Sequence, residues 1–101
     1  MINVIATIEV KPGTRQDFIT AFNNNVPAVL AEDGCIEYFP AIDIETEIGA
    51  QETNENVVVV IEKWESLDHL KAHLDAPHML SFRENAGHMI DGISLKIVEK
   101  A

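Results

Sequence analysis

The sequence is poor in cysteine, in basic residues and in long apolar runs. Its single cysteine, Cys35, rules out an internal disulfide, so we expect a reducing compartment, the cytoplasm. Only 7 Lys and Arg stand against 17 Asp and Glu, and this net charge of -10 disfavours binding to nucleic acid or an anionic membrane. No apolar run approaches the ~20 residues of a membrane-spanning helix. The start of the chain lacks the basic region of a signal peptide, so we expect none.

Motifs that hold cofactors or nucleophiles are also missing. The five glycines form neither a dinucleotide-binding nor a phosphate-binding loop, and no serine lies in a GxSxG context. His69 and His73 have ligand-like spacing, but Leu70 stands where the HExxH glutamate would be. Cys35 follows Gly34 at the start of a predicted strand, where we expect an inert thiol. We therefore predict no metal and no organic cofactor.

What is present is an ordinary globular composition with clear periodicity. The 101 residues are 47% hydrophobic and 24% charged, which favours one domain over residues 1–101. Alternating and β-branched residues predict four strands, and helical spacing predicts three helical segments. The predicted strands are 2–10, 35–43, 57–64 and 93–97, and the predicted helices lie between Thr14 and Gly34, after Ser66, and from Pro77 to Gly87. Residues 44–49 are expected to extend the second strand as a short hairpin arm.

The first helix has three unusual features. Pro27 lies inside it and predicts a kink, or a break after Asn25. Gly34 is the expected C-cap. Glu32 and Asp33 carry the wrong charge for the C-terminal end of a helix, and no local rule accounts for them.

The β-α-β-β-α-β order predicts an α+β, ferredoxin-like antiparallel sheet with its helices on one face. The other face is then bare, yet the run Val57–Ile61 is apolar at every position and Ile5 also points away from the helices. A half-exposed antiparallel sheet normally carries polar residues there. We therefore predict a homodimer through this face, with arms of the chain folding over it as the alternative.

The candidates for chemistry cluster in residues 62–78. Glu62 and Trp64 share a strand face, and His69 and His73 lie one turn apart on a helix. A histidine beside a carboxylate is held in one tautomer and accepts a proton near neutral pH, so His73 with Glu62 is the candidate acid–base pair. The alternatives are a core-edge histidine satisfied by hydrogen bonds and a Trp64 that serves only packing.

Several stretches together resemble the antibiotic-biosynthesis monooxygenase family, and its small bacterial quinol monooxygenases in particular. They keep the order and approximate spacing of that family over nearly the whole chain. The matching stretches are Val4–Ala6, Lys11–Gly13, Val26–Leu30, Glu32–Cys35, Tyr38 with Pro40 and Asp43, Ile61–Ser66, His69–Leu74 and Ala76–Met79.

The resemblance implies a dimeric α+β barrel with a pocket between each sheet and its own helices. It implies oxidation of a quinol or hydroxyaromatic by O₂ without metal, flavin or haem, in a dry cavity that supplies a base. On the matching positions, His73 is the expected base and Glu62 its orienting partner. Trp64 and Phe82 are the expected aromatic walls, and Tyr38 and His78 are further expected substrate-binding residues.

Two other functions stay open at this point. The sequence is also similar to the phosphorylated-autoinducer isomerases, which share this fold and have a Pro-His pair like Pro77-His78 here. A non-catalytic module that binds a small molecule is the second alternative. The haem-degrading branch of the family is disfavoured, because its asparagine, tryptophan and histidine positions correspond here to Ala6, His73 and Arg83.

Overall fold

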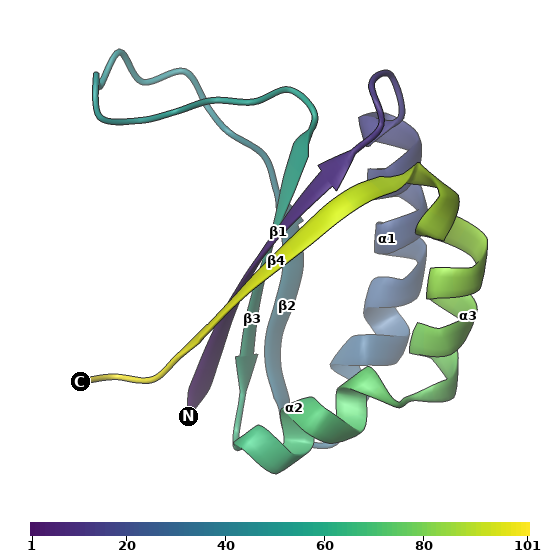
Figure 1. The fold of residues 1–101 in the computed structure, drawn as a ribbon. Helices are drawn as coiled ribbons and strands as arrows, with labels where there is room; N and C mark the ends of the chain where they lie inside the picture. The colour runs from purple at the N-terminus through teal and green to yellow at the C-terminus, as the bar shows by residue number, and fades with distance from the viewer.

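The chain folds into a four-stranded antiparallel sheet with helices on one of its faces, as Figure 1 shows for the computed structural model of residues 1–101. In chain order the elements are β1 (Ile2–Val10), α1 (Arg15–Leu30), β2 (Cys35–Ala41), β3 (Val57–Trp64), α2 (Leu67–Leu74), α3 (Pro77–Ala86), the 3-10 turn η1 (Gly87–Met89) and β4 (Ile90–Val98). The strand order β2-β3-β1-β4 confirms the predicted ferredoxin-like α+β fold. It also places β2, which contains Pro40, at an edge as expected.

Strict alternation along the two central strands sets the position of the core. On β1, Val4, Ala6, Ile8 and Val10 are buried against the helices, while the residues between them are more exposed. The antiparallel register pairs this face of β1 with Val58, Val60 and Glu62 of β3. The helical layer fills the other side of the core with α1 side chains, the most deeply buried being Phe18, Phe22 and Val29.

The opposite face of the sheet is apolar and has no helix over it (Figure 1). Ile5 of β1 lies opposite Ile61 of β3, and Phe39 of β2 lies on the other side of Ile61. Ile5 and Phe39 are each 43% exposed, a high value for large apolar side chains in the middle of a sheet. The predicted two-sided apolar sheet is therefore confirmed, and we call this surface, with Val57 and Val59, the open sheet face.

The long connection between β2 and β3 departs from the prediction. The second strand ends at Ala41, and residues 42–56 contain no strand, so the expected hairpin arm over 44–49 is wrong. Glu47 has a positive φ of 61°, which interrupts any extended run. The side-chain hydrogen bonds of the segment stay within it, such as the one that the backbone N–H of Asn54 donates to Asp43. In Figure 1 this arm projects beyond the sheet, away from the helices.

The first helix is continuous despite its proline. Pro27 lies within α1 without splitting it after Asn25, contrary to the expected break. Pro27 lies in the last turn and has no backbone N–H, so one helical hydrogen bond is lost. The fully buried Val29 anchors that turn to the core. The helix ends at Leu30, and Gly34 lies further on with a left-handed φ of 80°, leading the chain into β2. None of the helices combines the length and apolarity that crossing a bilayer requires.

Candidate active site

A cavity of about 240 Å³ lies between the helix-facing side of the sheet and the helices. Fourteen residues line it, and eleven of them are hydrophobic. The other three are Glu62 of β3, His73 of α2 and Arg83 of α3. An apolar pocket with a few convergent polar groups is the usual form of a small-molecule site. The volume lies below the ~300–1,000 Å³ typical of pockets for drug-sized ligands, so it suits a compound of one or two rings.

His73 is the polar side chain that the fold buries most completely. Ser66 caps α2 by accepting a hydrogen bond from the backbone N–H of His69, and Leu70 anchors the helix in the core one turn before His73. The His73 residue is only 2% exposed. Its ring centroid lies 4.7 Å from that of Trp64 and 5.4 Å from that of Tyr38. Aromatic neighbours therefore fix the position of the imidazole ring.

The orienting carboxylate of His73 is Glu32, not the predicted Glu62. Nδ1 of His73 lies 2.8 Å from Oε2 of Glu32, a distance typical of an N–H donating to a carboxylate. Nε2 of His73 has no hydrogen-bond partner in the chain. Because no enclosed side-chain nitrogen or oxygen lacks a partner, Nε2 is not enclosed, and the space that His73 lines is this cavity. A bare imidazole nitrogen facing an apolar cavity can take a proton from a bound hydroxyl.

Glu32 was missed as a site residue, although the sequence carried a signal for it. It follows the C-terminal end of α1, where a negative charge is unfavourable for the helix dipole. The structure explains the acidic residue at this position, because Glu32 accepts hydrogen bonds from two histidines, His73 and His78. Its neighbour Asp33 lies 3.5 Å from the His69 ring on the surface.

Glu62 lines the cavity but serves a different partner. Its Oε1 accepts a 3.0 Å hydrogen bond from the indole N–H of Trp64. Burial raises the pKa of the Glu62 carboxyl, and this effect exceeds the opposing influence of the Trp64 hydrogen bond and of His73. Burial thus makes the Glu62 carboxyl harder to ionise than an exposed glutamate.

The predicted aromatic walls are partly in place. Tyr38 and Phe82 line the cavity. Tyr38 stacks on Phe22 with centroids 5.2 Å apart, and Phe82 meets Phe22 edge to face at 5.7 Å. Burial raises the pKa of the Tyr38 phenol, so its hydroxyl stays protonated. Trp64 is fully buried and does not line the cavity, so it supports His73 from behind.

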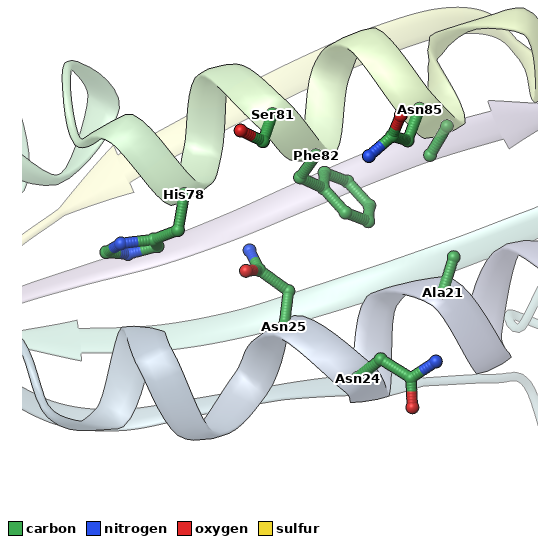
Figure 2. Close-up of a pocket in the computed structure, with 8 residues that line it drawn as sticks. Ala21, Asn24, Asn25, His78, Ser81, Phe82 and Asn85 are labelled. Carbon is green, nitrogen blue, oxygen red and sulfur yellow. The ribbon is translucent and has the colours of Figure 1, made fainter.

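His78 faces a second hollow, on the outside of the helical layer. Figure 2 shows this outer cleft, with His78 and Ser81 on α3 and Asn25 projecting from α1 into the space between the two helices. The outer cleft has a volume of about 390 Å³. Phe82 lines both the cleft and the inner cavity, so its ring forms part of the wall between them. His78 therefore has no contact with the cavity that was expected to hold the substrate.

The other candidate residues, His69 and Cys35, do not line the inner cavity. His69 has a side chain 29% exposed, against 2% for His73, so His69 lies nearer solvent. Burial and the charges of Glu32 and Glu62 raise the pKa of Cys35 to about 11, so the thiolate is disfavoured. No three His, Cys, Asp or Glu side chains are arranged to hold a metal ion.

The chain belongs to the antibiotic biosynthesis monooxygenase family, whose model matches residues 1–85. The sequence is 37% identical over 101 residues to "Probable quinol monooxygenase YgiN" of Escherichia coli, covering 98% of this chain and 97% of that protein. The resemblance noted from the sequence is thus confirmed.

Solved structures show the same fold. A conserved protein from Methanosarcina mazei superimposes with a TM-score of 0.83 at 24% identity, over 99% of this chain and 92% of that one. A structure described as an antibiotic biosynthesis monooxygenase gives 0.81 at 19% identity, over 100% and 99%. At such identities the likeness concerns the fold alone.

Proposed function

We propose that this protein is a monooxygenase that oxidises a quinol or related hydroxyaromatic with O₂, using residues 1–101 as one domain. The observation that carries the proposal is His73, which is buried and lines an apolar cavity, with Nδ1 held by Glu32 and Nε2 without a partner in the chain. Membership of the monooxygenase family and the similarity to a quinol monooxygenase support the reaction class. The single unpaired Cys35 supports a reducing compartment, the cytoplasm.

In the proposed mechanism His73 is the general base. A substrate hydroxyl gives its proton to Nε2, and the resulting imidazolium is stabilised by the Glu32 carboxylate at Nδ1. The electron-rich phenolate then reduces O₂ directly. For a quinol, one oxygen atom enters the ring to give a hydroxyquinone, and the other leaves as water, so that atoms and electrons balance. The protein needs to supply no further electrons.

The other cavity residues position the substrate. Tyr38 and Phe82 offer aromatic faces on which a ring can stack, and the Glu62 carboxyl is a hydrogen-bonding partner for a substrate hydroxyl. Trp64 holds the Glu62 carboxyl in place through its indole N–H. The largely apolar lining strengthens each of these polar contacts.

The test is oxygen uptake with a panel of one-ring and two-ring quinols, in the presence of a chelator. We expect uptake well above the rate of spontaneous quinol oxidation, and incorporation of one ¹⁸O atom from ¹⁸O₂ into the product. Turnover without oxygen would favour an isomerase of the same fold. Binding of a quinone without any turnover would favour a binding module. Loss of activity with the chelator would contradict the proposed chemistry without a metal.

We also propose a homodimer that covers the open sheet face. Four strands of seven to nine residues, at ~4.8 Å spacing and ~3.3 Å rise, cover roughly 500 Å². A stable interface needs about 800 Å² per partner, so the sheet alone is too small. The 42–56 arm extends beyond the sheet and exposes Ile44 and Ile48 at 70% and 64%, which provides further apolar area for a second copy.

A further inference from the structure

His73 and His78 share one oxygen atom of one carboxylate. Nδ1 of His73 lies 2.8 Å from Oε2 of Glu32, and Nε2 of His78 lies 2.7 Å from the same oxygen. The three residues come from α2, α3 and the turn after α1, so the fold brings them together from separate elements. A packing role for His78 does not require its ring nitrogen to meet this particular atom.

The two histidines face different compartments. The His73 side chain is only 2% exposed and lines the inner cavity, whereas the His78 side chain is 28% exposed and lines the outer cleft (Figure 2). Nδ1 of His78 has no partner in the chain and, like Nε2 of His73, is not enclosed. Glu32 therefore joins a nitrogen that can reach a substrate to a nitrogen that can reach water.

Two imidazolium ions on one carboxylate repel each other, whereas one imidazolium neutralises it. We propose that His78 is a proton-exchanging partner of His73, which releases a proton into the outer cleft when His73 accepts one from the substrate. This inference rests on the proposed function, since it assumes that His73 is the base. His78 touches no substrate and acts through Glu32, so it is a positioning residue.

The exchange balances without moving electrons. The O–H bond of the substrate breaks and an N–H bond forms at Nε2 of His73. At the same time the Nδ1–H bond of a protonated His78 breaks, and that proton passes to water in the cleft. Glu32 stays a carboxylate with one imidazolium beside it throughout. Both transfers reverse when the second oxygen atom of O₂ takes up its protons and leaves as water.

Other ionisable groups near the pair do not replace His78. Glu62 on β3 binds Trp64, and the pKa of Tyr38 on β2 is raised, so its phenol holds its proton. Cys35 on β2 likewise stays a thiol. Arg83 on α3 donates to the backbone oxygen of Leu74 and is permanently charged. Among these groups, only His78 combines contact with Glu32, exposure to water and a ring nitrogen that can gain or lose a proton.

The main experiment compares His78→Gln with wild type in oxygen uptake with 1,4-naphthoquinol in dilute buffer. Gln keeps an N–H donor for Glu32 but exchanges no proton at neutral pH. We expect turnover to fall roughly 10- to 100-fold, less than the 10²–10⁴ typical of a lost general base. Ser81→Ala, an exposed change in the same cleft, is the control and should keep wild-type turnover. Wild-type turnover by His78→Gln would overturn the inference.

Chemical rescue separates proton exchange from support of structure. His78→Ala leaves a space in the outer cleft next to Glu32, and added imidazole should restore turnover there in proportion to its concentration. Pyrazole has the same shape but is a far weaker base, so it should restore nothing. Equal rescue by both compounds, or by neither, would show that His78 serves only to hold Glu32 in place, and the inference would fail.

A readout independent of turnover keeps this inference distinct from the proposed function. Histidine ¹⁵N spectra between pH 5 and 8 report which ring nitrogens carry hydrogen. We expect His73 and His78 to hold one imidazolium between them before they hold two, and Glu32→Gln to remove this dependence. Independent charging overturns the inference whether or not quinols are consumed. A wild-type protein that consumes no quinol but shows coupled charging would refute the proposed function alone.

Discussion

At the scale of single residues, His73 and His69 offer a matched comparison on one helix. They lie one turn apart on α2, but the His73 side chain is 2% exposed beside Glu32, and that of His69 is 29% exposed beside Asp33. We predict that His73→Ala lowers quinol turnover by about 10²–10⁴, because the general base is lost. His69→Ala should change turnover by much less. Steady-state oxygen uptake, with circular dichroism to confirm folding, measures both.

If both variants kept wild-type turnover, His73 would be only a core-edge histidine that its hydrogen bond satisfies. A loss of activity in His69→Ala as large as that in His73→Ala would also contradict the assignment, because only His73 lines the cavity.

Glu62 makes a prediction about stability and pH. Burial raises the pKa of its carboxyl in the folded protein above the usual value near 4.5. Between the unfolded and the folded pKa, the folded state holds a proton that the unfolded state has released. Stability therefore falls as pH rises through this window, and the penalty is complete above the folded pKa. Glu62→Gln cannot ionise, yet its side-chain oxygen can still accept from Trp64.

We expect Glu62→Gln to gain stability relative to wild type as the pH rises from 4 to 8. The gain is about 1.4 kcal/mol for each unit by which burial raises the pKa. Urea unfolding followed by the fluorescence of Trp64 measures it. Glu65→Gln, an exposed change nearby, is the control and should follow wild type at every pH. A constant difference between Glu62→Gln and wild type across this range would contradict the prediction.

The sequence predicted individual site residues better than contacts between residues that lie far apart in the chain. His73, Glu62, Tyr38 and Phe82 were identified from the sequence, and all four line one cavity. The link between His73 and Glu32 spans 41 positions, and no local pattern reports it. The only trace of it was an acidic residue at the wrong end of a helix, which becomes informative once the position of α2 is known.

At the scale of elements, the periodicity of apolar residues predicted the strands and helices that pack into the core. The four strands and three helices follow apolar patterns that one sheet and one helical layer bury together. The 44–49 arm was mispredicted because Ile44 and Ile48 are apolar, but no neighbouring strand pairs with them. The break predicted after Asn25 does not occur, because tertiary burial of Val29 outweighs the one hydrogen bond that Pro27 removes.

The turn between α1 and β2 makes a prediction about Gly34. This residue has a φ of 80°, and a Cβ atom built on it would lie 2.3 Å from the ring of His69. Gly34→Ala should cost at least about 2 kcal/mol of unfolding free energy, from the left-handed backbone and the overlap together. Gly87→Ala is the control, because its φ is -58° and no atom lies within 4 Å of the added methyl group.

The double variant Gly34→Ala/His69→Ala divides the two causes. Removing the imidazole should restore most of the stability that the overlap costs, while the backbone strain and the contact with the Cβ of residue 69, 2.8 Å away, stay. Chemical denaturation measures the four variants of the cycle. Additive effects of the two substitutions would show that His69 does not press on Gly34.

At the scale of the whole molecule, the two faces of β3 make opposite predictions for the same substitution. Val59 lies on the open sheet face, whereas Val60 is 1% exposed in the core. Val59→Lys should place a charge in the proposed dimer interface, which costs several kcal/mol of association but leaves the subunit core intact. We expect sedimentation velocity to show a folded monomer. Val60→Lys should instead unfold the subunit.

Leu80→Lys tests whether any added lysine has this effect. Leu80 is 54% exposed on α3, far from the open sheet face, so its variant should sediment like the wild-type dimer. A wild-type protein that is monomeric at micromolar concentration would refute the dimer, and the 42–56 arm would then be the remaining candidate to cover the sheet. A Val59→Lys protein that stays dimeric would place the interface elsewhere. In either case the inner cavity would remain, because its lining comes from one subunit.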